Sequence, residues 1–251
     1  MKFFSSIALA SSFGQALAFP LASCQATAPY FVLTGDSTTA VDGGWGDGFL
    51  ALLTNGADGV NLGDSGATTR SFVAEGFWGQ AIAAVEANRD AYDPIVTIQF
   101  GHNDQKAESG VTLETFKTNL LGFIRDVQAA GGTPIIITSL THRTFSGGAV
   151  VENLVNERRI AIEAAEESGV LYLDLNRAST DYINAIGSAN ADYYNWGPGD
   201  RTHLNPAGTI VFGRLVADLL LEERADLDAY LIKNQELSDK LSAGEFATGD
   251  E

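Results

Sequence analysis

The sequence predicts a doubly wound α/β domain, in which a parallel sheet carries helices on both faces. Short apolar runs alternate along the chain with longer segments whose apolar residues recur at helical spacing. A connection of helix length between successive strands is what parallel pairing requires. No linker or internal repeat interrupts the alternation, and 45% of the residues are hydrophobic, so we expect one domain with a substantial core.

The expected strands are apolar runs that stop at glycine or small polar residues, as buried strands do at the edge of a sheet. The fourth, Pro-Ile-Ile-Ile-Thr-Ser, is almost continuously apolar, which is typical of a parallel strand covered on both faces. In chain order we place strands at Tyr30–Thr34, Gly59–Leu62, Pro94–Phe100, Pro134–Ser139 and Val170–Leu175.

Helices are predicted between these strands and after the last one. The longest connecting helix begins near Thr112, a good N-terminal cap, and stops at the pair Gly131-Gly132. We place helices at Trp45–Leu53, Gly76–Asn88, Leu113–Ala130, Val150–Ser168, Ala178–Ile186 and Pro206–Leu221.

The beginning of the chain has the form of a secretory signal. A lone lysine, Lys2, precedes a short apolar run that ends in Ala16-Leu17-Ala18. We therefore expect residues 1–18 to be removed and the protein to be secreted. Cys24 is the only cysteine, so no disulfide can form within the chain.

The end of the chain is more polar than the rest. We expect the folded domain to cover residues 19–225 and residues 226–251 to form a polar, acidic extension. Within it, Asp226–Leu241 is expected as a solvent-exposed helix and Ser242–Glu251 as a frayed tail.

The charge of the chain limits its partners. The formal net charge is −17, from 32 acidic and 15 basic residues. Such a surface repels polyanions, so we expect neither nucleic acid nor an anionic membrane as a partner. Residues beyond the leader include no run long and apolar enough to span a bilayer.

The first expected strand ends in Gly35-Asp36-Ser37-Thr38. In an open α/β sheet, ligands bind at the carboxyl edge, so Ser37 is well placed to be a nucleophile. The alternative is that Asp36, Ser37 and Thr38 only cap the next helix, and for this stretch alone that alternative is the simpler one.

Three further loops carry groups that a serine nucleophile needs. Asp200 and His203 are three residues apart, so the carboxylate can orient the imidazole while its other nitrogen accepts a proton. Gly66 offers a backbone N–H and Asn103 a side-chain amide for a developing oxyanion. Each of these residues alone is equally compatible with an ordinary cap, turn or surface position.

Together the four stretches resemble the sequence blocks of the GDSL, or SGNH, hydrolase family, from Tyr30 to about Leu221. The resemblance implies a flavodoxin-like sheet of five parallel strands and an esterase without metal or cofactor. It also assigns roles by position: Ser37 is the nucleophile, His203 the base and Asp200 the orienting acid, and the oxyanion hole consists of the Ser37 and Gly66 N–H groups and the Asn103 amide.

A narrower resemblance is to the rhamnogalacturonan acetylesterase branch. It rests on Gly35-Asp36-Ser37-Thr38, Gly44-Trp45-Gly46, Gly66 with Arg70-Ser71-Phe72, and Gly101-His102-Asn103-Asp104. That branch is secreted, often fungal, and removes acetyl groups from pectic or related polysaccharides. The second block also contains Gly63, which is the fallback for the oxyanion glycine.

Binding of a pectic polyanion to an acidic protein requires a local cationic patch, for which Arg70, Arg143 and Arg201 are candidates. A neutral substrate such as acetylated xylan avoids that requirement. Aromatic side chains that could stack on sugar rings are Trp45, Tyr193, Tyr194 and Trp196. We expect His102 to line the cleft and His142 to be a solvated loop residue.

The sequence therefore predicts a monomeric, secreted carbohydrate O-acetylesterase that acts on a pectin or rhamnogalacturonan type of polysaccharide. Alternatives on the same scaffold are a general short-chain carboxylesterase or lipase, an acetylxylan esterase, and a carbohydrate-binding protein without activity. A metal-dependent phosphoesterase is a further alternative, because Gly101-His102-Asn103-Asp104 loosely resembles a metal-binding sequence, although the chain has only 3 histidines.

Overall fold

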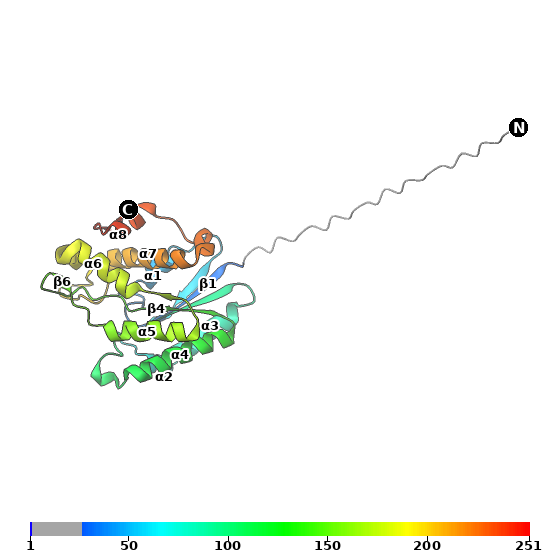
Figure 1. Cartoon of the computed structure of the whole chain (residues 1–251), viewed down its shortest axis with the longest axis horizontal. Coiled ribbons are helices and arrows are strands. Elements are labelled where there is room, and N and C mark those ends of the chain that lie inside the picture. The colour runs from blue at the N-terminus through cyan, green and yellow to red at the C-terminus, as the bar shows by residue number, and fades with distance from the viewer. Residues whose placement is uncertain (2–26) are drawn as a thin grey trace.

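The computed structural model describes Met1 and residues 27–251 (Figure 1). Apart from Met1, the predicted leader, its cleavage point after Ala18, and Cys24 lie outside the described residues. Within those residues, no helix combines the length and the apolar character that crossing a bilayer would require.

The centre of the domain is a sheet of five parallel strands in the order β2-β1-β3-β4-β7. The strands are β1 (Pro29–Gly35), β2 (Asp58–Asn61), β3 (Asp93–Gln99), β4 (Thr133–Ile137) and β7 (Tyr172–Leu173). β1 and β3 pair along their whole length, from Pro29 with Asp93 to Gly35 with Gln99. This strand order confirms the predicted doubly wound, flavodoxin-like fold.

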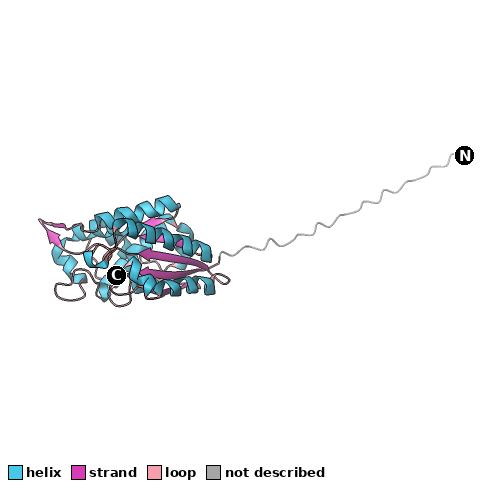
Figure 2. Cartoon of the chain, turned by 90° about the horizontal axis from the view of Figure 1, so that it is seen from below, coloured by secondary structure: helices cyan, strands magenta, loops and turns pink. Residues whose placement is uncertain are grey.

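Helices cover both faces of this sheet, and Figure 2 shows the strands between them. Side chains alternate along β1, so Phe31 and Leu33 belong to one apolar core and Val32 to the other. The first core contains α1 (Gly46–Leu50), α6 (Leu175–Ala191), α7 (Pro206–Glu223) and α8 (Gln235–Ala243). The second contains α2 (Thr69–Ala74), α3 (Phe77–Asn88), α4 (Leu113–Ala130) and α5 (Val155–Ser168).

Several predicted boundaries differ from the structure after β4. The helix expected from Val150 begins only at Val155, because β5 (Phe145–Ser146) and β6 (Ala149–Val150) form an antiparallel hairpin. Its turn is Gly147-Gly148, and both glycines have positive φ, which glycine adopts without strain. The last strand is shorter than expected, since Asp174 caps α6 by accepting a hydrogen bond from the Arg177 N–H.

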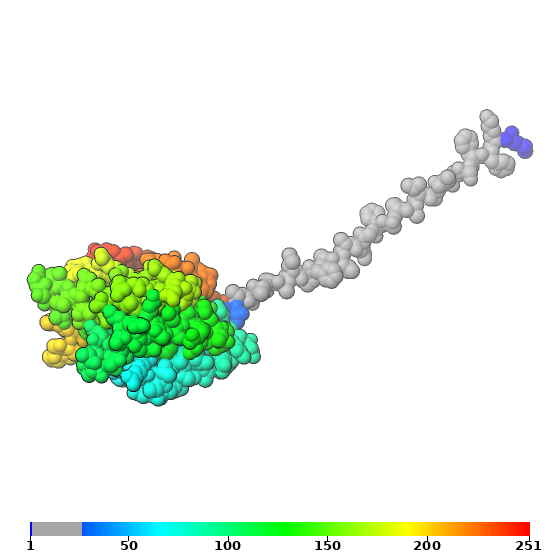
Figure 3. Space-filling model, turned by 60° about the horizontal axis from the view of Figure 1, so that its bottom comes forward, coloured from blue at the N-terminus to red at the C-terminus, as the bar shows by residue number. Residues whose placement is uncertain are grey.

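The expectation of a frayed C-terminal tail is wrong. Ala247 is fully buried; its carbonyl accepts a hydrogen bond from the Tyr194 hydroxyl at 2.7 Å, and its N–H donates to the Tyr182 hydroxyl at 3.2 Å. The last residues, red in Figure 3, lie against the rest of the body. Although burial opposes it, hydrogen bonds from Lys240 and backbone N–H groups lower the pKa of Glu251 to about 2.

Residues 226–251 are also not an exposed extension. The chain forms a 3-10 helix, η3 (Ala225–Tyr230), and then α8, and both bury leucines against the domain. Leu237 and Leu241 are four residues apart and therefore lie on one face of α8. The signal for this packing was present in the sequence, but the high polarity of the surrounding residues obscured it.

Candidate active site

A tight turn at the carboxyl end of β1 places Ser37 at the edge of the sheet. The Asp36 carbonyl accepts hydrogen bonds from the N–H groups of Thr39 at 3.0 Å and Ala40 at 3.1 Å. A Cβ at Gly35 would lie 2.4 Å from the Thr39 hydroxyl and 2.6 Å from the Gln99 carbonyl, so only glycine fits before this turn.

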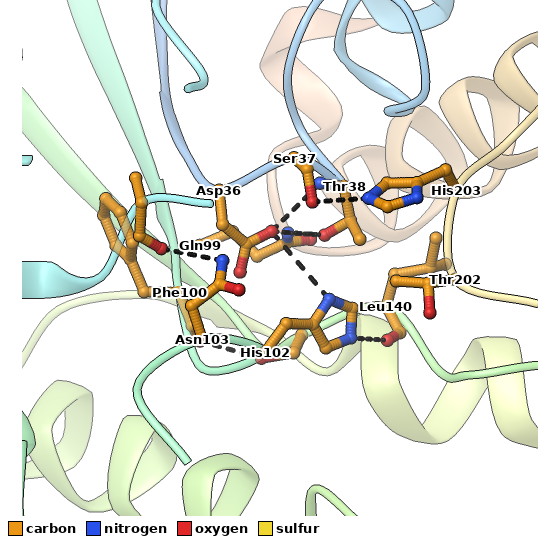
Figure 4. A network of polar contacts seen from close by, with 12 residues as sticks. Asp36, Ser37, Thr38, Gln99, Phe100, His102, Asn103, Leu140, Thr202 and His203 are labelled. Carbon is orange, nitrogen blue, oxygen red and sulfur yellow. Dashed lines mark hydrogen bonds and ion pairs between the residues drawn. The ribbon is translucent and has the colours of Figure 1, made fainter. Parts of the chain in front are cut away.

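A chain of hydrogen bonds connects the side chains of Ser37, His203 and Asp200. The Ser37 Oγ lies 2.9 Å from His203 Nε2, and His203 Nδ1 lies 2.9 Å from Asp200 Oδ2. Figure 4 shows Ser37 and His203 pointing toward each other. The structure thus brings together residues that are 166 positions apart. The alternative that this stretch only caps a helix does not describe Ser37, whose hydroxyl faces the imidazole.

The Asp200 carboxylate has a second role in the loop. Its Oδ1 accepts hydrogen bonds from the backbone N–H groups of Thr202 at 3.1 Å and His203 at 3.0 Å. Burial acts in the opposite direction, but these bonds and the imidazole lower the pKa of Asp200. An ionised Asp200 accepts the Nδ1–H of His203 and leaves Nε2 free to accept the proton of Ser37.

A buried arginine, Arg143, supports the loop that carries Asp200 and His203. Arg143 follows β4 and donates from Nε to Asn195 Oδ1 at 2.9 Å, and from its terminal nitrogens to the carbonyls of Thr202 at 3.4 Å and His203 at 2.5 Å. Only 1% of Arg143 is exposed, so its predicted place in a surface cationic patch is wrong. Burial lowers its pKa to about 10, which leaves it charged at neutral pH.

The two expected oxyanion donors meet beside β1. The Asp64 N–H donates to the Gly35 carbonyl at 3.0 Å, and the turn that follows contains Gly66 with a φ of 85°. Asn103 donates from Nδ2 to the Ala67 carbonyl at 3.0 Å, which brings it against the same turn. Gly63 is packed: a Cβ there would lie 2.6 Å from the Ala40 nitrogen, whereas Gly66 is exposed and open. The geometry favours Gly66 over Gly63.

Three residues predicted to line the cleft or stack on sugar rings are buried instead. Trp45 is 0% exposed and donates from Nε1 to Gln99 Oε1 at 2.8 Å, so it cannot stack on a sugar. His102 is 4% exposed and donates from Nε2 to the Leu140 carbonyl at 2.7 Å. It lies behind the nucleophile and does not line a cleft. Tyr194 is also fully buried, in the core that holds the C-terminal segment.

The remaining substrate-binding candidates differ in how far they are exposed and in whether they are paired with a carboxylate. Trp196 is 51% and Tyr193 45% exposed, and both precede the loop with Asp200 and His203. Arg201 is paired with both carboxylate oxygens of Asp192, at 2.9 and 3.1 Å. Arg70 is exposed, and no carboxylate within residues 27–251 forms an ion pair with it.

A buried polar network that was not predicted from the sequence lies behind Ser37. Gln99 donates from Nε2 to the Thr38 hydroxyl at 2.6 Å, and that hydroxyl donates to Asp36 Oδ1 at 2.8 Å (Figure 4). With the bond from Trp45, this gives a directed chain of donors that holds the turn at Ser37. The available signal was a glutamine in a mostly apolar strand, where an unpaired amide would be costly.

All 3 histidines of the chain gather at the site. The rings of His102 and His142 are 4.6 Å apart, and His142 Nδ1 lies 2.9 Å from the Thr202 hydroxyl. The expectation that His142 is a solvated loop residue is therefore wrong. Burial, together with nearby His102 and Arg143, lowers the pKa of His142 to about 3. Burial also lowers the pKa of His102, although the charge of Asp36 opposes it.

We expect the low pKa of His142 to reduce stability in acid. Between about pH 3 and 6.5, unfolded His142 binds a proton that the folded state excludes, so stability falls as pH falls. Relative to His142→Gln, the wild type should lose up to about 1.4 kcal/mol of unfolding free energy per pH unit in that range. Urea unfolding of both proteins at several pH values between 4 and 7 measures the difference; parallel curves would contradict it.

A serine, a histidine and a carboxylate aligned at the carboxyl edge of a parallel α/β sheet define a serine hydrolase. Residues 33–209 match the model of the GDSL-like lipase/acylhydrolase family, and the chain belongs to this family. The resemblance found in the four sequence blocks is confirmed.

Two relatives come from Bacillus subtilis (strain 168). Rhamnogalacturonan acetylesterase RhgT is 30% identical over 223 residues, covering 81% of this chain and 94% of that protein. Probable rhamnogalacturonan acetylesterase YesY is 24% identical over 221 residues, covering 83% and 100%. Both are bacterial proteins, so the fungal character of the predicted branch stays an expectation.

Solved structures share the fold. The acetylxylan esterase Axe2 from Geobacillus stearothermophilus has a TM-score of 0.57 at 19% identity, over 79% of this chain and 94% of that chain. The protein YXIM_BACsu from Bacillus subtilis has a TM-score of 0.67 at 24% identity. The match covers 79% of this chain and 57% of the YXIM_BACsu chain. At these identities the likeness concerns the fold alone.

Proposed function

We propose that this chain is a secreted carbohydrate O-acetylesterase that removes acetyl groups from a pectin or rhamnogalacturonan type of cell-wall polysaccharide. The observation that carries the proposal is the line from Ser37 through His203 to Asp200, with both distances 2.9 Å. The names of the two curated relatives support the substrate class.

In the proposed mechanism the Ser37 oxygen attacks the acetyl carbonyl while His203 Nε2 takes the hydroxyl proton. The N–H groups of Ser37 and Gly66 and the free amide N–H of Asn103 donate to the resulting oxyanion. The protonated His203 then gives its proton to the departing sugar oxygen, which leaves acetyl-Ser37. A water molecule deprotonated by His203 attacks this ester and releases acetate, and the proton returns to Ser37.

The surface near the loop also supports a sugar substrate. The exposed rings of Tyr193 and Trp196 can stack on sugar faces, and Arg70 can meet a uronic carboxylate. Arg201 contributes less positive charge, because Asp192 neutralises it.

We also propose that the protein is a monomer that acts outside the cell. N-terminal sequencing of the protein from the medium tests cleavage after Ala18.

Acetylxylan is the second candidate substrate, and the net charge of −17 favours it because a neutral polymer is not repelled. A general short-chain carboxylesterase or lipase shares the same catalytic groups. Within residues 27–251, no group of three or more His, Cys, Asp or Glu side chains could hold a metal, so the phosphoesterase alternative gains no support.

Initial rates of ester hydrolysis should distinguish these substrates. We expect acetate release from acetylated rhamnogalacturonan to exceed that from acetylated xylan, and both to exceed hydrolysis of a medium-chain ester at equal ester concentration. The acid released from each ester is measured directly, and Ser37→Ala serves as the blank. A faster reaction with the medium-chain ester would contradict the proposal in favour of a lipase, and no ester hydrolysis at all would favour a carbohydrate-binding protein.

A further inference from the structure

The side-chain amide of Asn103 is held in a single orientation. Its Oδ1 accepts a hydrogen bond from the Lys106 ammonium at 2.7 Å, and one Nδ2–H donates to the Ala67 carbonyl at 3.0 Å (Figure 4 shows the Asn103 side chain). A flipped amide would put its NH₂ against the ammonium and its oxygen against the carbonyl, and both contacts would be repulsive. One N–H therefore stays available on the side of the turn with Gly66.

Lys106 reaches Asn103 through a short turn of the same loop. The Lys106 N–H donates to the Asn103 carbonyl at 3.1 Å, and the Gln105 N–H donates to the Gly101 carbonyl at 3.0 Å. The loop is tied to α2 by Asp104, whose Oδ1 accepts from the N–H and hydroxyl of Thr69 at 2.9 and 2.6 Å. The ammonium thus approaches Asn103 from a backbone that is fixed at both ends.

The charge of Lys106 is not neutralised locally. No carboxylate within residues 27–251 lies in ion-pair distance of its ammonium, whereas Lys117, Lys233 and Lys240 each have an acidic partner. Burial is the main reason that the pKa values of His102 and His142 are low, and the charge of Lys106 adds to the lowering in both. A positive charge therefore acts within the site of a strongly acidic protein.

A charged donor to the amide oxygen of Asn103 changes the strength of its amide N–H groups as hydrogen-bond donors. It polarises the amide, which strengthens the remaining N–H as a donor, and hydrogen bonds in series reinforce one another. The gain grows as negative charge develops on the substrate oxygen, so it is larger in the transition state than in the ground state. Such an effect raises kcat and leaves KM nearly unchanged.

We propose that Lys106 is a positioning residue of the oxyanion hole, which orients and polarises the Asn103 amide. The proposal rests on the proposed function, because it takes Asn103 as an oxyanion donor. It assigns to Lys106 no contact with the substrate.

The first test uses p-nitrophenyl acetate, a neutral ester without a sugar. Lys106→Met should lower kcat about tenfold, below the effect of removing an oxyanion donor itself, with KM changed less than about twofold. Lys106→Arg should recover most of the rate, since it restores a charged donor. The control is Lys117→Met on α4, which removes the same charge from a residue paired with Glu163 and Glu167 and should leave kcat unchanged.

A double-mutant cycle tests whether Lys106 acts through Asn103. In an Asn103→Ala background, Lys106→Met should have no further effect on kcat. Thermal unfolding of Lys106→Met and of a second variant, Lys106→Gln, should match the wild type, because the Lys106 side chain is exposed.

Two results would overturn the proposal while leaving the esterase function intact. One is an unchanged kcat of Lys106→Met on p-nitrophenyl acetate, with KM raised only for acetylated rhamnogalacturonan; Lys106 would then bind a substrate carboxylate. The other is that Lys106→Met lowers kcat by the same factor in the wild type and in the Asn103→Ala background. A wild type that hydrolyses no ester would instead contradict the proposed function, and this proposal with it.

Discussion

Replacement of Ser37 by alanine should lower kcat for acetyl ester hydrolysis by at least about 10³-fold, because the nucleophile of the proposed acetyl-enzyme is lost. KM should change little, since the hydroxyl makes one contact, to His203 Nε2, and the backbone of the turn is held by other groups. Acetate release at saturating substrate measures the effect. The folded state should persist, because alanine fits wherever serine does in this turn.

The matched control for this variant is Ser146→Ala, in the exposed hairpin of β5 and β6, which should keep the wild-type rate. If Ser37→Ala keeps more than about a tenth of the wild-type kcat, the proposed nucleophile is wrong, since even a partial loss of the catalytic groups is far larger in serine hydrolases.

Replacement of Asp200 by asparagine should lower kcat by roughly 10³- to 10⁴-fold while leaving the loop folded. The asparagine oxygen can still accept the backbone bonds of Thr202 and His203 that Oδ1 now accepts. Its NH₂ group would then face His203 Nδ1, which could only accept. The proton would move to Nε2, and His203 could no longer accept the proton of Ser37.

Rates and thermal unfolding together test this expectation. Asp200→Asn should unfold at a temperature close to that of the wild type, whereas Asp200→Ala loses the backbone bonds and should unfold earlier. Asp181→Asn, which removes a carboxylate paired with Arg177 on α6, is the control and should be fully active. Near wild-type activity of Asp200→Asn would show that His203 needs no orienting acid.

Much of the fold follows from local patterns. Apolar runs that break at glycine placed the strands to within a few residues, and helix-length connections between them required parallel pairing. The register of β1 with β3 brings the stretch at Ser37 and the stretch at Asn103 to neighbouring positions at one sheet edge. This register explains why the stretches at Ser37 and Asn103, two of the four blocks that the family resemblance singled out, lie side by side.

Other expectations failed because the burial of a side chain depends on which other parts of the fold pack against it. Trp45 and His102 lie in the predicted blocks, yet one supports Gln99 and the other donates to the Leu140 carbonyl. Arg143 has the sequence environment of a surface cation but is enclosed by the loop that it holds. The polarity of residues 226–251 likewise hid the few leucines that dock them.

By itself the sequence predicted a doubly wound parallel sheet and the edge at which ligands bind, because the periodicity of apolar residues is a local property. Its resemblance to the GDSL, or SGNH, family named Ser37, Gly66, Asn103 and His203 as the candidate set. Only the tertiary structure decided which polar groups support that set from behind. Hydrogen bonds such as those from Arg143 to the His203 carbonyl and from Lys106 to Asn103 depend on the final distance between loops, to within an ångström or less.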